Sequence, residues 1–170
     1  MAQWAADLQR TTRAMGRTVT KEQLQSLAGH ELGVSDWFEI DQRRVDAFAD
    51  VTEDHQFIHV DPVRARATPF GGTIAHGLLT LSLIVPLCID FVPEIAGRQL
   101  VVNYGFDRVR FPAPVKVGAR IRSRVKRADV SERKPGQFMM KLDVTFDIEG
   151  GDKPALTAQW LSLHVVGSAA

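Results

Sequence analysis

The sequence lacks several features that would assign it to a special class of protein. Cysteine occurs once among 170 residues, at Cys88, so no disulfide can form within the chain, which is typical of a reducing compartment. Neither sign of charge dominates, because 21 Lys and Arg residues are balanced by 20 Asp and Glu residues. This balance excludes the strong basic excess of a nucleic-acid-binding protein. The remaining composition, 45% hydrophobic and 24% charged, predicts one soluble globular domain.

The sequence also lacks a hydrophobic run long enough to cross a membrane. The longest uncharged apolar stretch covers residues 77–89, is 13 residues long and contains Pro86, which suits a buried core helix. The N-terminal residues include Asp7, Arg10 and Arg13 where a signal peptide would have an apolar run. We therefore expect a cytoplasmic protein that has neither a membrane nor a nucleic acid as its partner.

Capping residues and hydrophobic periodicity predict mainly helices in the first half of the chain. Residues 1–30 are expected to form a peripheral helical extension, in which residues 20–23 have the pattern of a capping box. A strand over residues 34–40 should lead into an amphipathic helix whose N-cap is Asp41.

The segment after this helix, residues 53–60, is expected to be irregular. Asp61 and Pro62 then form a strong start signal for another short helix. A long helix should follow over residues 77–89, and the second half of the chain alternates apolar and polar residues in the manner of strands. The expected strands are residues 100–111, 115–121, 138–148 and 155–166.

This order of elements indicates an α+β fold with a single domain over residues 31–167. The helix over residues 77–89 is apolar on nearly every side, so other structure must wrap around it. An antiparallel sheet curled around one such helix is the hot-dog arrangement. The exposed edge of this sheet would be protected by a second copy, so we expect a homodimer.

The most informative stretch places a carboxylate and an imidazole five residues apart, at Asp54 and His59, in a loop between two helices. A carboxylate beside a histidine can hold one water molecule, and either group can move a proton near neutral pH. The residues alone favour a structural interpretation, because polar residues are common in loops. In that interpretation, Asp54 caps a turn and His59 packs beside Ile58.

A glycine-containing segment leads directly into the apolar helix and ends at Gly77. The first N–H groups of a helix have no partner within it, and they can stabilise a thioester carbonyl that becomes an enolate. Glycine also lets another molecule approach the backbone closely. The alternative is that the glycines only form a tight loop and the helix end is satisfied internally.

A metal site is a further possibility, and we expect none. Asp54, His55, His59 and His76 are conceivable ligands, and His55 and His59 have the i, i+4 spacing of a helical zinc pair. The start signal at Pro62 argues against a helix through this pair. The sequence also contains no cysteine cluster and no HExxH pattern.

Two other chemically distinctive side chains are expected to be structural. Cys88 lies in the apolar helix, where a free cysteine usually acts as a small hydrophobic residue. It has no neighbouring base in the sequence, so it is a poor candidate nucleophile. His164 lies within the last predicted strand.

Several segments, taken in order, resemble the MaoC-like hot-dog dehydratases, which include the (R)-specific enoyl-CoA hydratases. A closer similarity is to the single-hot-dog subgroup named nodulation protein N-like. The segments that carry the resemblance are residues 32–37, 54–62, 74–79 and 103–112. The resemblance extends over residues 30–165, and the combination of segments in this order is specific.

The resemblance implies a hydro-lyase of fatty-acid metabolism that converts a trans-2-enoyl-CoA reversibly to an (R)-3-hydroxyacyl-CoA without a metal or redox cofactor. The catalytic aspartate and histidine of the family match Asp54 and His59, and its carbonyl-binding backbone N–H matches Gly77. The substrate would be a thioester of CoA or of acyl carrier protein. The positions expected to bind it are His76, Leu78, Leu79 and Ser82.

Two other functions are compatible with the same fold. The family usually has Asn-Pro where this chain has Gln56 and Phe57, and often Gly where it has Glu53. The Gln56–Phe57 departure would suit a hot-dog protein that binds acyl thioesters without turning them over. A hot-dog thioesterase would instead direct water at the thioester carbonyl carbon. Thioesterases generally carry an acidic residue on the central helix, and residues 78–89 contain none.

Overall fold

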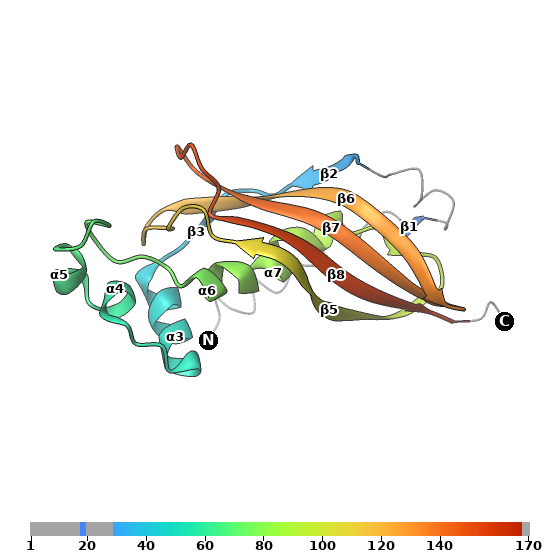
Figure 1. Ribbon diagram of the computed structural model, residues 1–170, viewed down its shortest axis with the longest axis horizontal. Helices are drawn as coiled ribbons and strands as arrows, with labels where there is room; N and C mark the ends of the chain where they lie inside the picture. The colour runs from blue at the N-terminus through green and yellow to red at the C-terminus, as the bar shows by residue number, and fades with distance from the viewer. Residues whose placement is uncertain (1–17, 20–28, 168–170) are drawn as a thin grey trace, which may run out of the picture.

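The computed structural model describes residues 18–19 and 29–167, in which a curved antiparallel sheet carries helices on one face and at one end (Figure 1). The main sheet has the strand order β2-β6-β7-β8-β5, and β3 pairs with one end of β6. The strands are β1 (Thr18–Val19), β2 (Glu31–Val34), β3 (Phe38–Glu39), β4 (Glu94–Ile95), β5 (Arg98–Arg110), β6 (Arg120–Lys134), β7 (Gln137–Ile148) and β8 (Leu156–Val166). The predicted α+β architecture is therefore confirmed.

All helices among the described residues lie between β3 and β4 in the chain. They are α3 (Gln42–Thr52), α4 (Phe57–Val60), α5 (Pro62–Ala65), α6 (Gly77–Ser82), α7 (Ile84–Cys88) and the 3-10 helix η1 (Ile89–Phe91). Figure 1 shows α6 and α7 against one face of the sheet, with α3, α4 and α5 grouped beyond one end of it. No helix in the described ranges is long and apolar enough to cross a membrane.

The hydrophobic core lies between the sheet and the α6–α7 segment. Strand β7 has the predicted alternation, because every second side chain is buried against the helices. The buried side chains of β7 are Phe138, Met140, Leu142, Val144 and Phe146. Those of β8, whose inner face could not be chosen from the sequence, are Leu156, Ala158, Trp160, Ser162 and His164.

The single helix predicted over residues 77–89 is divided at Leu83 into α6 and α7. Pro86 explains the break, because its ring nitrogen has no hydrogen to donate to the Ser82 carbonyl and its ring crowds that carbonyl. Among the described residues, the α6–α7 segment is covered on one side only. Leu78 is 62% exposed and Val85 is 41% exposed, whereas the side chains that face the sheet are buried.

Two other expectations about the strands need correction. The strand expected over residues 34–40 consists of β2 and β3, which are separated by residues 35–37. Residues 115–119 are not part of the sheet, because they pair with the segment before α6, where Ala75 N–H donates to the Val115 carbonyl. The helical extension over residues 1–30 lies almost entirely outside the described residues. The extension therefore stays a prediction. Within it, residues 18–19 form β1, which pairs in parallel with β4.

The caps of the helices around residue 54 agree with the sequence. Asp41 accepts a hydrogen bond from Arg44 N–H at the start of α3, and Asp61 accepts from two N–H groups at the start of α5. The expectation of an irregular segment over residues 53–60 is wrong for its second half. Residues 57–60 form α4, one turn in which Asp61 N–H donates to the Phe57 carbonyl.

Both residues expected to be structural are buried. Burial raises the pKa of the Cys88 thiol to about 12, so the thiolate is not available as a nucleophile. His164 is fully buried, and its Nε2 lies 2.9 Å from the Ser162 hydroxyl. Burial, with a smaller contribution from the positive charge of Arg98, lowers the pKa of His164 to about 4. His164 is therefore neutral in the folded protein at neutral pH.

The lowered pKa of His164 predicts that mild acid destabilises the protein. Between about pH 6.5, the usual histidine pKa, and about pH 4, the unfolded chain binds a proton that the folded chain excludes. The free energy of unfolding is therefore unaffected by His164 above about pH 6.5. It falls by about 3 kcal/mol as the pH is lowered from about 6.5 to about 4. Urea denaturation at several pH values should show the decline, and His164→Gln should flatten it. An identical decline in the variant would contradict the assignment.

Candidate active site

The candidate site begins where α3 ends. The Thr52 hydroxyl donates to the Phe48 carbonyl in the last turn, and Glu53 follows with a left-handed φ of 60°. The chain thereby leaves the helix, and Asp54 is exposed in the connection to α4. One carboxylate oxygen of Asp54 lies 3.5 Å from the Gln56 N–H, which is the limit of a hydrogen bond. The carboxylate therefore retains acceptor capacity for a water molecule.

His59 lies in α4, and a backbone carbonyl orients its ring. Its Nδ1 is 2.7 Å from the Ile74 carbonyl oxygen, which can only accept, so Nδ1 carries the hydrogen. Desolvation by burial lowers the pKa of His59; the Ile74 hydrogen bond and Asp54 oppose this shift, and His76 adds to it. In the neutral ring, Nε2 is consequently an acceptor.

A hydrogen-bond network that the sequence does not indicate fixes the backbone of His59. The Gln42 Nε2 donates to the His59 carbonyl at 2.7 Å and to Asp46 at 2.8 Å. The Gln42 Oε1 accepts from the Thr73 hydroxyl at 2.7 Å. Gln42 thus links α3, α4 and the segment before α6, and Ile74, which holds the His59 ring, directly follows Thr73.

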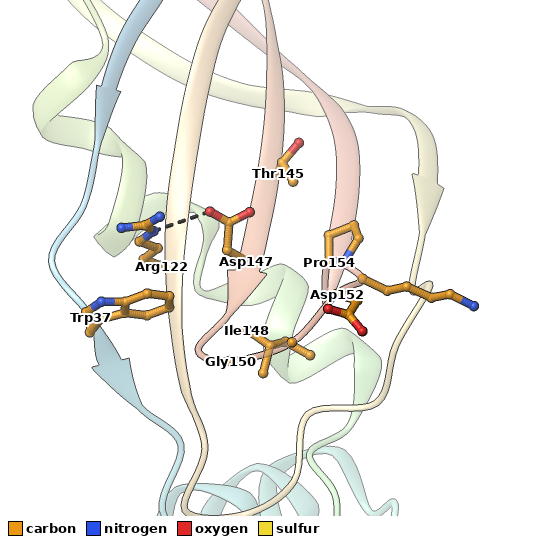
Figure 2. A pocket seen from close by; sticks show the side chains of 10 residues that line it. Trp37, Arg122, Thr145, Asp147, Ile148, Gly150, Asp152 and Pro154 are labelled. Carbon is orange, nitrogen blue, oxygen red and sulfur yellow. Dashed lines mark hydrogen bonds and ion pairs between the residues drawn. The ribbon is translucent and has the colours of Figure 1, made fainter.

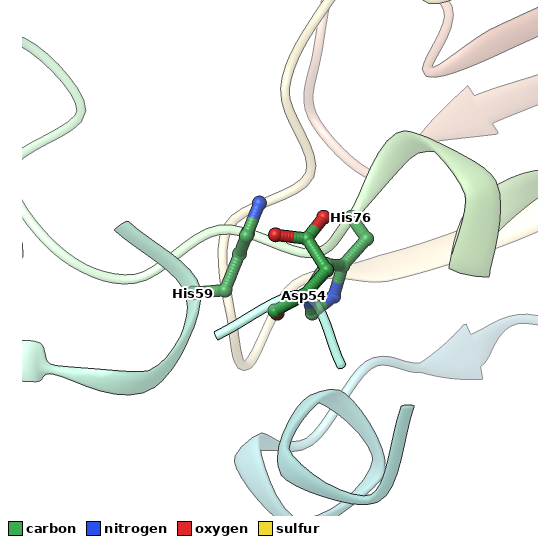
Figure 3. A group of neighbouring side chains, drawn as sticks. All are labelled: Asp54, His59 and His76. Carbon is green, nitrogen blue, oxygen red and sulfur yellow. The ribbon is translucent and has the colours of Figure 1, made fainter. Parts of the chain in front are cut away.

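Asp54, His59 and His76 come together in space, as Figure 3 shows. Each offers one potential metal-ligand atom, and these atoms lie within 4.8 Å of one another. The rings of His59 and His76 are stacked, however, with centroids 3.8 Å apart and planes at 27°. Imidazole lone pairs lie in the ring plane, so stacked rings do not direct them at a common ion. The arrangement suits a small hydrogen-bonding molecule better than a metal.

A cavity of about 280 Å³ lies beside His59 and is lined mainly by apolar groups. Its lining residues are His59, Ile74, Ala75, Gly77, Thr80, Phe111, Ala113, Pro114, Val115 and Ala155. Gly77 is the first residue of α6, so its N–H has no partner within that helix. A Cβ at Gly77 would lie 3.0 Å from the Phe111 ring, so glycine lets this ring pack closely against the start of α6.

The structure does not bring every predicted site residue to this cavity. Leu79 is buried in the core, Leu78 is exposed, and the exposed Ser82 hydroxyl donates to the Leu78 carbonyl. None of the three lines the cavity, so their predicted contact with substrate stays a prediction. His55 is paired with Asp50 at 3.0 Å. Thr80 and Phe111 also line the cavity and were not predicted. Thr80 lies on α6, where nearly every side is apolar and the face that meets a ligand cannot be chosen from the sequence. Phe111 directly follows β5 and reaches the cavity from a part of the chain distant in sequence.

A second cavity, of about 340 Å³, lies on the outer face of the sheet beside β6 and β7 (Figure 2). The Arg122 guanidinium stacks on the Trp37 ring, 4.5 Å from its centroid, and pairs with Asp147 at 3.3 Å. Arg124 also pairs with Asp147. These charges satisfy one another. The second cavity includes neither His59 nor Gly77, both of which line the first cavity, so we assign the chemistry to the first cavity.

Comparison with known proteins gives one family and several close relatives. Residues 23–146 match the family described as MaoC like domain. Nodulation protein N of Rhizobium meliloti is 47% identical over 146 residues, which are 85% of this chain and 91% of that protein. The 3-hydroxyacyl-thioester dehydratase Z of Mycobacterium tuberculosis is 44% identical over 142 residues, which are 84% of this chain and 93% of that protein.

A solved structure supports the same likeness in three dimensions. The (R)-hydratase of A. caviae superimposes with a TM-score of 0.66 at 27% identity. The superposition covers 79% of this chain and 94% of that chain. The antiparallel sheet around an apolar helix is therefore the fold that this hydratase also has.

Proposed function

The chain belongs to the MaoC-like dehydratase family and is a hydro-lyase, and on this premise we propose that it hydrates trans-2-enoyl-CoA reversibly to (R)-3-hydroxyacyl-CoA. One observation carries the proposal. An exposed carboxylate, Asp54, and a buried histidine with a free acceptor nitrogen, His59, lie together beside an apolar cavity. This pair can hold a water molecule at the place where an enoyl chain would enter.

The geometry of the pair suits one shared water. A water that donates to two acceptors at about 2.8 Å each separates them by about 4.5 Å. A carboxylate oxygen of Asp54 and a ring nitrogen of His59 lie within 4.8 Å of each other. Because His59 Nδ1 donates to Ile74, the remaining Nε2 accepts one water hydrogen and Asp54 accepts the other. The lone pairs of the water oxygen then remain free for C3 of the substrate.

The proposed reaction follows from this placement. The water oxygen bonds to C3 while Asp54 or His59 takes its proton, and the C2=C3 electron pair moves toward the thioester carbonyl. The Gly77 N–H donates to the enolate oxygen as negative charge develops there. The proton taken from water returns to the carbonyl-conjugated carbon C2, so hydration adds one hydrogen and one hydroxyl. Dehydration follows the same steps in reverse.

We also propose that a second copy of the chain is the protein partner. Strand β5 forms the open edge of the main sheet, and its Leu100, Val102 and Tyr104 are exposed. Leu78 and Val85 leave the outer side of α6 and α7 apolar. A homodimer would cover such surfaces. In this proposal, residues 31–167 form the catalytic domain, residues 1–30 an extension, and the protein acts in the cytoplasm.

Turnover of crotonyl-CoA tests the proposed function. We expect the purified chain to remove the ultraviolet absorbance of the enoyl thioester without releasing free thiol. Longer enoyl-CoA chains and the same acyl groups on acyl carrier protein would then identify the preferred carrier. Thiol release without hydration would indicate a thioesterase, and saturable binding without turnover would indicate an acyl-thioester binder. Either result would contradict the proposal.

A further inference from the structure

His76 contacts several parts of the proposed site, although it does not line the cavity. Its side chain is 3% exposed, and it immediately precedes Gly77 at the N-cap position of α6. The side chain makes no capping hydrogen bond to that helix. A buried polar side chain is normally satisfied by a specific partner, so the burial of His76 has to be explained by a contact elsewhere.

That contact is with the backbone of Asp54. The Nε2 of His76 lies 2.9 Å from the Asp54 carbonyl oxygen, and it must donate because the carbonyl can only accept. Among the described residues, the Asp54 side chain has only the 3.5 Å contact with the Gln56 N–H. The hydrogen bond from His76 therefore holds the peptide from which the Asp54 carboxylate projects, at the point where the chain turns out of α3.

The same ring supports His59. The two imidazoles are stacked with centroids 3.8 Å apart, and the Phe48 ring lies 5.1 Å from the His76 ring at 49°. His59 is thus held at its Nδ1 edge by the Ile74 carbonyl and across its face by His76. The Nδ1 of His76 is buried and makes no hydrogen bond within the part of the chain that the structure describes. The bond to Asp54 is therefore the principal polar contact of this ring.

We propose that His76 is a positioning residue that sets the distance between the Asp54 carboxylate and the His59 Nε2 so that both hold one water. This inference rests on the proposed hydratase function. The family resemblance implies that His76 contacts the substrate, whereas in this proposal His76 acts through Asp54 and His59. The N–H donor at Nε2 is the essential feature, because a stacked ring without it makes no hydrogen bond to the Asp54 carbonyl.

Two variants separate the donor from the ring. His76→Phe keeps a stacking ring and has no donor, whereas His76→Gln keeps an N–H donor of similar reach and has no ring. With crotonyl-CoA, we expect kcat of His76→Phe to fall about 100-fold, because small misplacements of catalytic groups cost about this much. In His76→Gln, kcat should recover to within about tenfold of wild type. KM should stay within about threefold in both, because His76 does not touch the substrate.

His164→Gln is the matched control, since it replaces an equally buried histidine away from the cavity. Its kcat should equal that of wild type at neutral pH. If His76→Phe does not fold, His76→Asn, which is too short to reach the Asp54 carbonyl, should show the same loss of kcat. An unchanged kcat in the donor-free variants, or a rise in KM alone, would overturn the inference. A wild-type chain without turnover would contradict the hydratase function itself.

Discussion

Replacing Asp54 by Asn is expected to lower kcat for crotonyl-CoA hydration by about 10³-fold, within the range for loss of a general acid–base group. Asparagine has nearly the same size, but its amide cannot take a proton from water. The side chain is exposed, and within the described ranges its one hydrogen-bond contact is 3.5 Å long, so the variant should unfold at the same temperature as wild type. Steady-state kinetics and a thermal melt measure the two effects.

The adjacent acid provides the control for this variant. Glu53 is also exposed, and Glu53→Gln removes the same charge one residue away. We expect Glu53→Gln to keep nearly full kcat. For the other member of the pair, His59→Gln should lose activity as Asp54→Asn does, while His55→Gln should not, because His55 is paired with Asp50. Equal activity of Asp54→Asn and Glu53→Gln would show that general electrostatics, not a proton transfer at Asp54, supports the reaction.

Gly77→Pro is expected to lower kcat by about 10²-fold, the lower end of the cost of removing one oxyanion-hole donor. Proline removes the N–H that is proposed to donate to the enolate oxygen. The fold should accept the change, because proline is favoured at the first position of a helix. The preceding His76 already has the extended conformation, φ −60° and ψ 139°, that a following proline requires.

Gly77→Ala separates the donor from added bulk. Alanine keeps the N–H, but its Cβ would approach the Phe111 ring to 3.0 Å, so the ring must shift slightly. Phe111 is partly exposed and can move, so we expect a small effect on kcat and a rise in KM. If the alanine and proline variants lose kcat equally, crowding of the cavity explains the loss and the N–H is not a catalytic donor.

Local signals in the sequence predicted much of the fold. Asp41 and Asp61 are short acceptor side chains at helix starts, and both cap the helices that they were expected to cap. Strand β7 has a strict two-residue alternation, so its buried face followed directly. These features depend on neighbours within a few residues, which is why they are readable without a structure.

The break at Leu83 was missed because the apolar character of the segment suggested a continuous helix. Pro86 was present as a signal, and its effect falls on the Ser82 carbonyl at the end of α6. The face of this helix that meets the cavity could not be chosen, since nearly all of its residues are apolar. Which side is covered depends on where the sheet lies, and that is a long-range property.

Residue type and spacing drew attention to the candidate pair and the family resemblance implied its role, but neither indicated its supports. Gln42 donates to the His59 carbonyl across 17 positions, and His76 donates to the Asp54 carbonyl across 22. A side chain that bonds a distant backbone carbonyl has no sequence pattern of its own. The left-handed turn at Glu53, by contrast, has a signal in the sequence of the family. Its φ of 60° favours glycine, which the resembled family often has at this position.

The handedness of the product tests the central claim most directly. A water held by Asp54 and His59 approaches a bound enoyl chain from one side only, so hydration of crotonyl-CoA should give a single enantiomer of 3-hydroxybutyryl-CoA. We expect an (R)-selective dehydrogenase to oxidise all of the product and an (S)-selective one to oxidise none. A mixture of both enantiomers would contradict the placement of the water by this pair, and an (S)-product would contradict the proposed (R)-hydratase function.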